Sequence, residues 1–227
     1  TRKESSAASD VYKRQLLISS SEIGQRAAQH GNVLAAAKAE GVSFIAYTSI
    51  LNAQDSAMAL AEEHKATEDM LAASGIAHTL LRNGWYSENI TMTLGQDLEL
   101  GKHFGAAGAG KLASATRQDY ADAAAVVLAG GHDGEVLELA GDEAYTLAEY
   151  AALVSELSGK AVTYTDMPEA AFTEALVGAG LPAGFAAILA DSDAKAAEGA
   201  LFDDSKTLSK LIGRPTEPIA ETIKAAL

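Results

Sequence analysis

The residues best suited to chemistry follow a short apolar segment in the first half of the chain. Residues 79–81 have the length and composition of a buried strand, which Arg-Asn-Gly at 82–84 then ends. The next four residues read Trp-Tyr-Ser-Glu, and Trp85 is the only tryptophan of the chain. Because ligands of open α/β sheets bind beyond the carboxyl ends of the strands, this loop is a candidate binding site. The alternative is a tight hairpin turn at Asn-Gly, with Trp85 packed in the core.

Two earlier strand patterns also end in hydrogen-bonding residues. The apolar run at 16–19 continues into Ser-Ser-Glu, and the run at 42–47 is followed by Thr-Ser. Helical patterns over 26–40 and 57–74 separate the three strands, which indicates parallel crossovers and an α/β layered sheet. Parallel strands bring their carboxyl ends to one edge of the sheet. We therefore expect the three polar strand ends to form one site.

The remainder of the chain gives weaker patterns. A glycine-rich turn at 105–110 lacks the spacing of a phosphate loop and is predicted to be an ordinary loop. Thr116 or Asp119 could cap a helix at 121–128, and Thr146 could cap a helix that ends before Gly159. The other expected elements are a short helix at 90–101, strands at 135–139 and 161–164, helices at 168–178 and 182–197, and two C-terminal helices separated by a break at 213–215.

Composition excludes several classes of function. The net charge of −14, from 17 basic and 31 acidic residues, argues against nucleic acid or an anionic membrane as the partner. The chain has no cysteine, so disulfides and cysteine-based metal sites are excluded, and its five histidines are too scattered to predict a metal site. No apolar run approaches the roughly 20 residues of a membrane helix. No secretory signal is visible, so we expect a cytoplasmic protein of one large domain or one domain with an appendage.

The first fifteen residues differ from the rest. They are polar and without periodicity, and Asp-Val-Tyr-Lys-Arg-Gln at 10–15 looks like a translated transposon-end sequencing adapter. We therefore set residues 1–15 aside as a non-native scar; the alternative is a native flexible arm.

Four segments together resemble a known family. They are Leu-Leu-Ile-Ser-Ser-Ser-Glu at 16–22, Phe-Ile-Ala-Tyr-Thr-Ser at 44–49, Leu-Leu-Arg-Asn-Gly-Trp-Tyr-Ser-Glu-Asn at 80–89, and Leu-Phe-Asp-Asp-Ser-Lys-Thr-Leu-Ser-Lys-Leu-Ile-Gly at 201–213. They resemble the bacterial type-2 NAD(P)H:quinone oxidoreductases, in the NmrA-like branch of the atypical short-chain dehydrogenases. The resemblance implies a doubly wound Rossmann-type sheet over 16–130 and a small C-terminal α+β substrate lobe over 131–227 that interleaves with it. It also implies NADPH as cofactor, a quinone as substrate, and neither flavin nor metal.

The chain departs from the family in two places. No G-x-x-G-x-x-G precedes residue 16, so the first βαβ unit, with the glycine-rich loop that holds the pyrophosphate, is missing from the sequence. We expect the chain as given to bind the cofactor poorly, to be inactive and to be poorly soluble. The Tyr-x-x-x-Lys pair of short-chain dehydrogenases falls at Leu60 and His64, so the phenolic acid is absent.

The resemblance carries specific residues onto this sequence. The residues implied to bind the cofactor are Ser19, Ser20, Ser21, Thr48, Asn83, Gly84 and Arg117. The residues implied to border the substrate are Trp85, Tyr86, Ser87, Glu88 and Tyr120. The residues implied to be catalytic are Tyr86, Ser49 and His64. Of these, His64 stands where the family lysine would hold the nicotinamide ribose. The alternatives are a capped helix histidine for His64 and a solvated side chain for Arg117.

The resemblance predicts hydride transfer to a quinone. A hydroquinone oxyanion is already stabilised by its ring, so the missing tyrosine acid is tolerable, and Tyr86 or water could deliver the proton. The alternative is a non-catalytic NADP(H)-binding redox sensor, and the absence of the tyrosine agrees with this alternative as well. A reductase or isomerase acting on another carbonyl substrate is a weaker alternative, since it would normally need that acid. The sequence leaves the oligomeric state open, with a homodimer among the alternatives.

Overall fold

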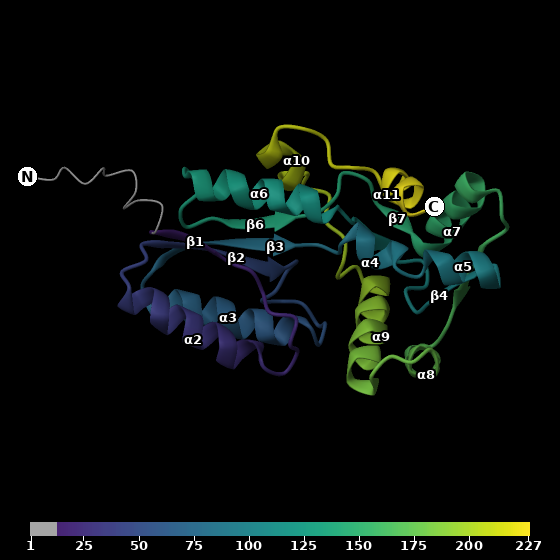
Figure 1. The fold of residues 1–227 in the computed structure, drawn as a ribbon, viewed down its shortest axis with the longest axis horizontal. Helices are drawn as coiled ribbons and strands as arrows, with labels where there is room; N and C mark the ends of the chain where they lie inside the picture. The colour runs from purple at the N-terminus through teal and green to yellow at the C-terminus, as the bar shows by residue number, and fades with distance from the viewer. Residues whose placement is uncertain (1–12) are drawn as a thin grey trace, which may run out of the picture.

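The computed structural model describes residues 13–227, and Figure 1 shows a twisted sheet with helices on both faces. All neighbouring strands of the sheet are parallel, in the order β1-β2-β3-β6. The strands are β1 (Arg14–Leu17), β2 (Phe44–Ile50), β3 (Ala77–Asn83) and β6 (Val136–Leu139). Helices α2 (Arg26–Ala39) and α3 (Ala61–Ser74) lie on one face, and α6 (Arg117–Ala129) and α10 (Thr207–Ile212) lie on the other. The predicted doubly wound α/β architecture is confirmed.

The side chains of β2 divide between two hydrophobic cores, because successive residues of a strand point to opposite faces. Ile45 and Tyr47 belong to the cluster beneath α2 and α3, whereas Phe44 and Ala46 belong to the cluster beneath α6. All seven residues of β2 are buried. Burial of both faces explains why this strand reads as a nearly continuous apolar run.

Strand β1 begins at Arg14, two residues before the expected start at residue 16. The Arg14 guanidinium lies 3.6 Å from the centroid of the Phe44 ring, and its Nε donates a hydrogen bond to the backbone oxygen of Leu128 at 3.0 Å. These long-range contacts are invisible in a polar local sequence. Residues 14 and 15 of the segment set aside above therefore take part in the sheet, while residues 1–12 lie outside the described residues.

Local patterns misplaced several other elements. The helix expected at 90–101 is two short helices, α4 (Ser87–Thr91) and α5 (Leu94–Leu100), and the strand expected at 161–164 is β8 (Thr163–Asp166). β8 pairs in parallel with β4 (Lys102–Gly105), a strand too short to show an alternating pattern. Helix α3 begins at residue 61 rather than 57, and the chain between β2 and α3 makes a turn in which Asn52 has a φ of 51°.

The second part of the molecule lies beyond the carboxyl ends of the sheet strands (Figure 1). Besides α4, α5, β4 and β8, it contains β5 (Lys111–Leu112), β7 (Tyr145–Thr146), α7 (Leu147–Ser158), α8 (Glu169–Gly178), α9 (Ala183–Ala197) and α11 (Ile219–Ala226). One cluster of buried apolar side chains, which includes Leu112, Tyr150 and Leu201, joins most of these elements. None of the described helices has both the length and the apolar composition needed to cross a membrane.

A buried ion pair ties the central strands to α3. Arg82 of β3 donates through Nη2 to Glu68 Oε2 at 2.7 Å and through Nη1 to Glu138 Oε1 of β6 at 2.8 Å. Ser49 of β2 donates to the other oxygen of Glu68 at 2.6 Å. Burial raises the pKa of the Glu68 carboxyl, but the hydrogen bonds from Arg82, Ser49 and Gln54 outweigh burial, and the net pKa lies below its ordinary value.

Replacing Arg82 by Met should lower the free energy of unfolding by about 3 kcal/mol, because the buried Glu68 carboxylate loses its charged partner. Urea unfolding followed by circular dichroism measures this loss. Lys224→Met is the control: Lys224 pairs with Glu221 at the surface, where both side chains are exposed, so the change should stay within about 0.5 kcal/mol. Similar small effects in both variants would contradict the importance of the buried pair.

Candidate functional site

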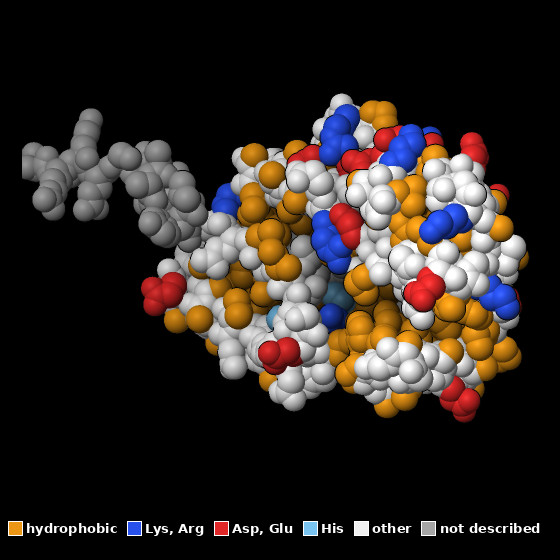
Figure 2. All heavy atoms as spheres, turned by 45° about the vertical axis from the view of Figure 1, so that its right-hand side comes forward, with side chains coloured by type: hydrophobic (Ala, Val, Ile, Leu, Met, Phe, Trp, Pro, Cys, Tyr) orange, Lys and Arg blue, Asp and Glu red, His pale blue; other side chains and the backbone are white. Residues whose placement is uncertain are grey.

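A cavity of about 550 Å³ lies where β1, β2 and β3 end and the second part of the molecule begins. Polar strand ends form its floor, and apolar side chains of α8 and α9 form the opposite wall. Figure 2 shows the surface hollowed at this place, with hydrophobic side chains along one side of the opening. The predicted site residues that line the cavity are Ser19, Ser21, Ser49, His64, Asn83, Gly84, Trp85 and Tyr86. The expectation that the three polar strand ends meet at one site is therefore confirmed.

Two predicted cofactor residues act instead as supports for the loop that follows β1. Thr48 Oγ1 accepts a hydrogen bond from the backbone N–H of Ser19 at 2.8 Å. The backbone N–H of Ser20 donates a hydrogen bond to His30 Nε2 at 3.0 Å. Neither Thr48 nor Ser20 lines the cavity. Their hydrogen bonds hold the backbone that presents Ser19 and Ser21.

Two predicted substrate residues lie behind the aromatic loop. Ser87 is buried, and its hydroxyl lies 2.9 Å from the hydroxyl of Ser114. The Tyr120 hydroxyl donates to the backbone oxygen of Trp85 at 3.4 Å, and the Tyr120 ring lies 5.3 Å from the Tyr86 ring. Neither residue lines the cavity. They position the backbone that carries Trp85 and Tyr86.

Arg117 and Glu88 form an outer layer beside Tyr86. The Glu88 carboxylate accepts the backbone N–H of Arg117 at 2.9 Å, at the start of α6. The guanidinium of Arg117 lies 4.9 Å from the centroid of the Tyr86 ring and donates to Asn89 Oδ1 at 2.7 Å. Arg117 is exposed and does not line the cavity. Arg117 therefore contacts the Tyr86 ring from outside the set of residues that line the cavity.

A buried polar cluster lies under the floor and centres on His64. The Tyr47 hydroxyl lies 2.9 Å from His64 Nδ1, and Arg26 Nη1 lies 3.2 Å from His64 Nε2. A guanidinium only donates, so Nε2 accepts and Nδ1 carries the proton that is donated to Tyr47. Burial, and then the charge of Arg26, lowers the pKa of His64 to about 3. His64 is therefore neutral near pH 7, and the positive charge at this place belongs to Arg26.

Sequence reasoning missed Arg26, which is buried and lines the cavity. Its Nε donates a hydrogen bond to the backbone oxygen of Ser20. The backbone N–H of Arg26 donates a hydrogen bond to the Glu63 carboxylate at 3.1 Å. Arg26 and His64 are 38 residues apart in the chain, so no local spacing could have shown their contact. A basic residue at the start of an Ala-rich helix was the only available signal.

The end of β3 brings backbone and an unpaired acceptor to the cavity. Asn83 Oδ1 is buried without a hydrogen-bond partner among the described residues. A Cβ on Gly84 would lie 3.1 Å from the Tyr120 hydroxyl and 3.2 Å from the backbone oxygen of Leu139. Glycine therefore allows the end of β3 to pack this closely, and the alternative of a hairpin turn at Asn-Gly is excluded because β3 continues into α4.

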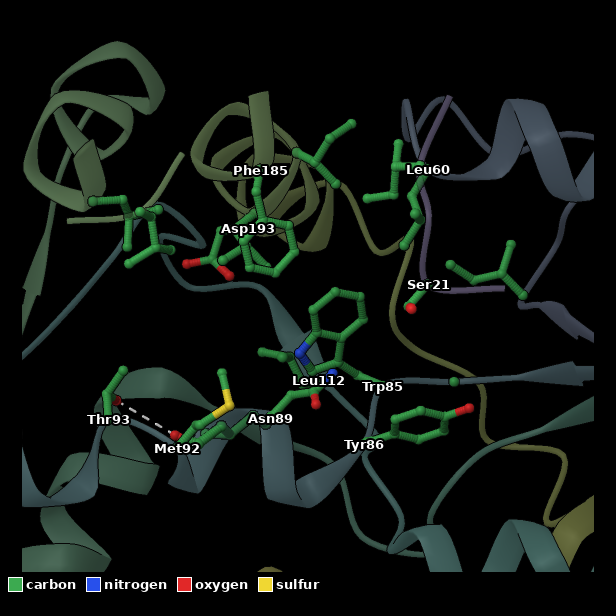
Figure 3. Close-up of a pocket in the computed structure, with 18 of the residues that line it drawn as sticks. Ser21, Leu60, Trp85, Tyr86, Asn89, Met92, Thr93, Leu112, Phe185 and Asp193 are labelled. Carbon is green, nitrogen blue, oxygen red and sulfur yellow. Dashed lines mark hydrogen bonds between the residues drawn. The ribbon is translucent and has the colours of Figure 1, made fainter. Parts of the chain in front are cut away.

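The wall formed by α8 and α9 was also missed, since its helices read only as apolar patterns. It contributes Phe172, Leu176, Phe185, Ile188 and Leu189, and the sole lining carboxyl of the described residues is Asp193. Figure 3 shows Trp85 projecting from the strand end into the space that faces Phe185. The cavity thus has a polar, cationic floor on one side and an apolar wall on the other.

Comparison with known proteins identifies the family. The chain is 61% identical over 209 residues to quinone oxidoreductase 2 of Escherichia coli, covering 92% of this chain and 73% of that protein. The chain belongs to the type-2 quinone oxidoreductases. The crystal structure of the E. coli NADPH-dependent quinone oxidoreductase complexed with NADPH superposes with a TM-score of 0.93 at 60% identity, over 94% of this chain and 76% of that chain. No family model matches the sequence.

Two further relatives place this family in a wider group. The crystal structure of Citrobacter triphenylmethane reductase complexed with NADP(H) has a TM-score of 0.89 at 36% identity, over 95% of this chain and 77% of that chain. An NmrA-like family domain-containing oxidoreductase of Aspergillus flavus is 29% identical over 149 residues, which cover 59% of this chain and 45% of that protein. The resemblance to the NmrA-like branch is confirmed.

The neutral His64 predicts a pH dependence of stability. The unfolded chain binds a proton at His64 near pH 6.5 and the folded chain only near pH 3, so this stabilisation is complete above pH 6.5 and is lost as the pH falls. The free energy of unfolding should fall by up to about 1.4 kcal/mol per pH unit below 6.5 through this group. Urea unfolding at pH 7 and pH 5 should show a smaller difference in His64→Gln than in the wild type. Lys65→Gln, at the exposed neighbouring position, should show the same difference between pH 7 and pH 5 as the wild type. If His64→Gln also shows the full wild-type difference, the neutral state assigned to His64 is wrong.

Proposed function

We propose that the chain reduces quinones with NADPH by direct hydride transfer, without flavin or metal. The observation that carries this proposal is the 61% identity to quinone oxidoreductase 2 together with a TM-score of 0.93 to the NADPH complex of that enzyme. The cavity supports it, because polar groups for a dinucleotide and aromatic side chains for a flat acceptor line one space.

The floor of the cavity fits the nicotinamide end of a dinucleotide. Within residues 13–227, Asn83 Oδ1 is a buried acceptor without a donor, and the carboxamide NH₂ of a nicotinamide would supply one. We assign Ser19, Ser21, Asn83 and Gly84 to cofactor binding, with Ser49 beside them. NADPH supplies the hydride when it is bound; the protein supplies orientation and charge.

The wall and Trp85, which faces it, suit a planar acceptor. Trp85 and Phe185 offer flat faces to a quinone ring, and the surrounding leucines and isoleucine exclude water. A quinone that has gained a hydride carries negative charge on oxygen, which a cation in a dry site stabilises more strongly than it would in water. We assign that role to Arg26. His64 and Tyr47 act as positioning residues that hold the guanidinium in place.

Consumption of NADPH in the presence of 1,4-benzoquinone tests the proposal directly. The assay should cover NADPH concentrations up to the millimolar range, with binding followed separately by NADPH fluorescence. The expected result is oxidation of NADPH that depends on the quinone; absence of both oxidation and binding would contradict the proposal and agree with the inactivity expected from the sequence. Binding of NADPH without consumption by several acceptors would instead support the redox sensor.

Replacing Trp85 by Ala should separate quinone binding from cofactor binding. We expect the KM for benzoquinone to rise about tenfold through loss of aromatic contact, while the Kd for NADPH changes less than twofold. Trp85→Phe, which keeps a flat ring, should retain most of the quinone affinity. Equal losses in KM and Kd for the alanine variant would remove the assignment of Trp85 to the quinone.

A further inference from the structure

Asp193 has no part in the function described so far. It lies on α9, the helix that forms the cavity wall facing the strand ends, and Figure 3 shows its carboxyl group among the side chains that line the space around Trp85. It belongs to the acceptor side of the cavity, because the cofactor groups proposed above come from the sheet. Among the described residues it is the only carboxyl that lines the cavity.

One oxygen of Asp193 is fixed and the other is free. Oδ2 accepts the backbone N–H of Ala106 at 3.0 Å. A Cβ on Gly105 would approach Oδ2 to 2.7 Å, so the glycine permits this close packing. Oδ1 has no hydrogen bond to any described residue. The carboxyl group is therefore held in one orientation while retaining one oxygen for a ligand.

The surroundings shift the pKa of the Asp193 carboxyl group upward. Burial raises the pKa of Asp193 above its ordinary value, the Ala106 N–H and the nearby His103 oppose this, and the charge of Asp166 adds to it. His103 comes from β4 and is hydrogen-bonded to Asp97 at 2.8 Å, whereas Asp166 comes from β8 and accepts the Tyr164 hydroxyl at 2.8 Å. Neutral His64 has its ring proton committed to Tyr47, so it is no competing acid.

We propose that Asp193 is the acid that delivers a proton to the reduced quinone. A quinone that has accepted a hydride is a hydroquinone monoanion, which carries both electrons of the reduction. The Asp193 O–H bond breaks, a phenolic O–H bond forms on that oxyanion, and the carboxylate regains a proton from solvent. No electron passes through Asp193. This proposal rests on quinone reduction as the function of the cavity.

The first test compares the pH dependence of quinone binding, followed by quenching of Trp85 fluorescence without cofactor. In the wild type, affinity should fall as the pH rises through the pKa of Asp193, because the protonated acid donates to a quinone oxygen and the carboxylate repels it. Asp193→Asn keeps an acceptor for Ala106 and should bind independently of pH. Asp191→Asn is the matched control: Asp191 is on the same helix, does not line the cavity and accepts the Ala59 N–H at 2.8 Å. It should retain the wild-type dependence.

The second test uses turnover. Asp193→Asn should lower kcat for benzoquinone about tenfold, and the fall of kcat with rising pH should disappear; the effect is below the usual 10²-fold or more of a general acid because the oxyanion is already delocalised. A cationic triphenylmethane dye accepts a hydride and needs no proton. Its kcat should therefore be the same in the wild type and in Asp193→Asn.

The outcomes separate the two proposals. If no variant oxidises NADPH with any quinone, the proposed function fails, whereas the binding test still reports on Asp193. An unchanged pH dependence in Asp193→Asn, or an equal loss of kcat with quinone and dye, would show a structural role and overturn the proton transfer. Should Asp193→Asn fail to fold, a ¹³C NMR titration of the wild-type carboxyl decides: a pKa at or below the ordinary 3.8 overturns the proposal.

Discussion

The parallel register of β1, β2 and β3 is the constraint on which the site depends. It places the residues after all three strands at one edge, and the carboxyl ends point toward the second part of the molecule (Figure 1). The register is itself held by burial of both faces of β2 and by the Arg82–Glu68 pair beneath Ser49. A one-residue shift in the register of one strand would turn each of its side chains to the opposite face, and its polar end would no longer contribute to the floor of the cavity.

The polar groups in the floor are buried, and nearly all of them have hydrogen-bond partners. Arg26, His64 and Tyr47 form a chain in which each donor meets one acceptor, so a buried cation is tolerated next to a neutral imidazole. Asn83 Oδ1 is the exception, since it has no hydrogen-bond partner among the residues that the structure describes. A site built in this way is preorganised, because its dipoles need little rearrangement when charge develops on a bound molecule.

The sequence predicted the layers, the parallel strands of the first half and the meeting of the polar strand ends, because these follow from local periodicity and chain connectivity. For the same reason it predicted that Trp85 and Tyr86 follow the end of a strand and lie at the site. It could not predict Arg26 or Asp193 as lining residues, since each reaches the cavity through contacts between distant segments. The roles of Thr48, Ser87 and Tyr120 as supports likewise depend on packing: they lie one layer behind the surface that a motif identifies.

The wall of the cavity adds little to the hydrophobic cores. Phe172 is the only buried residue of α8, and the buried residues of α9 are the small Ala186, Ala190, Ser192 and Ala196, of which Ala196 alone belongs to a core cluster. The packing of the sheet is therefore largely separate from the wall. Substitutions in the wall can therefore accumulate without loosening the sheet. This separation lets the range of accepted molecules drift during evolution while the dinucleotide end of the site, and the stability of the domain, stay the same.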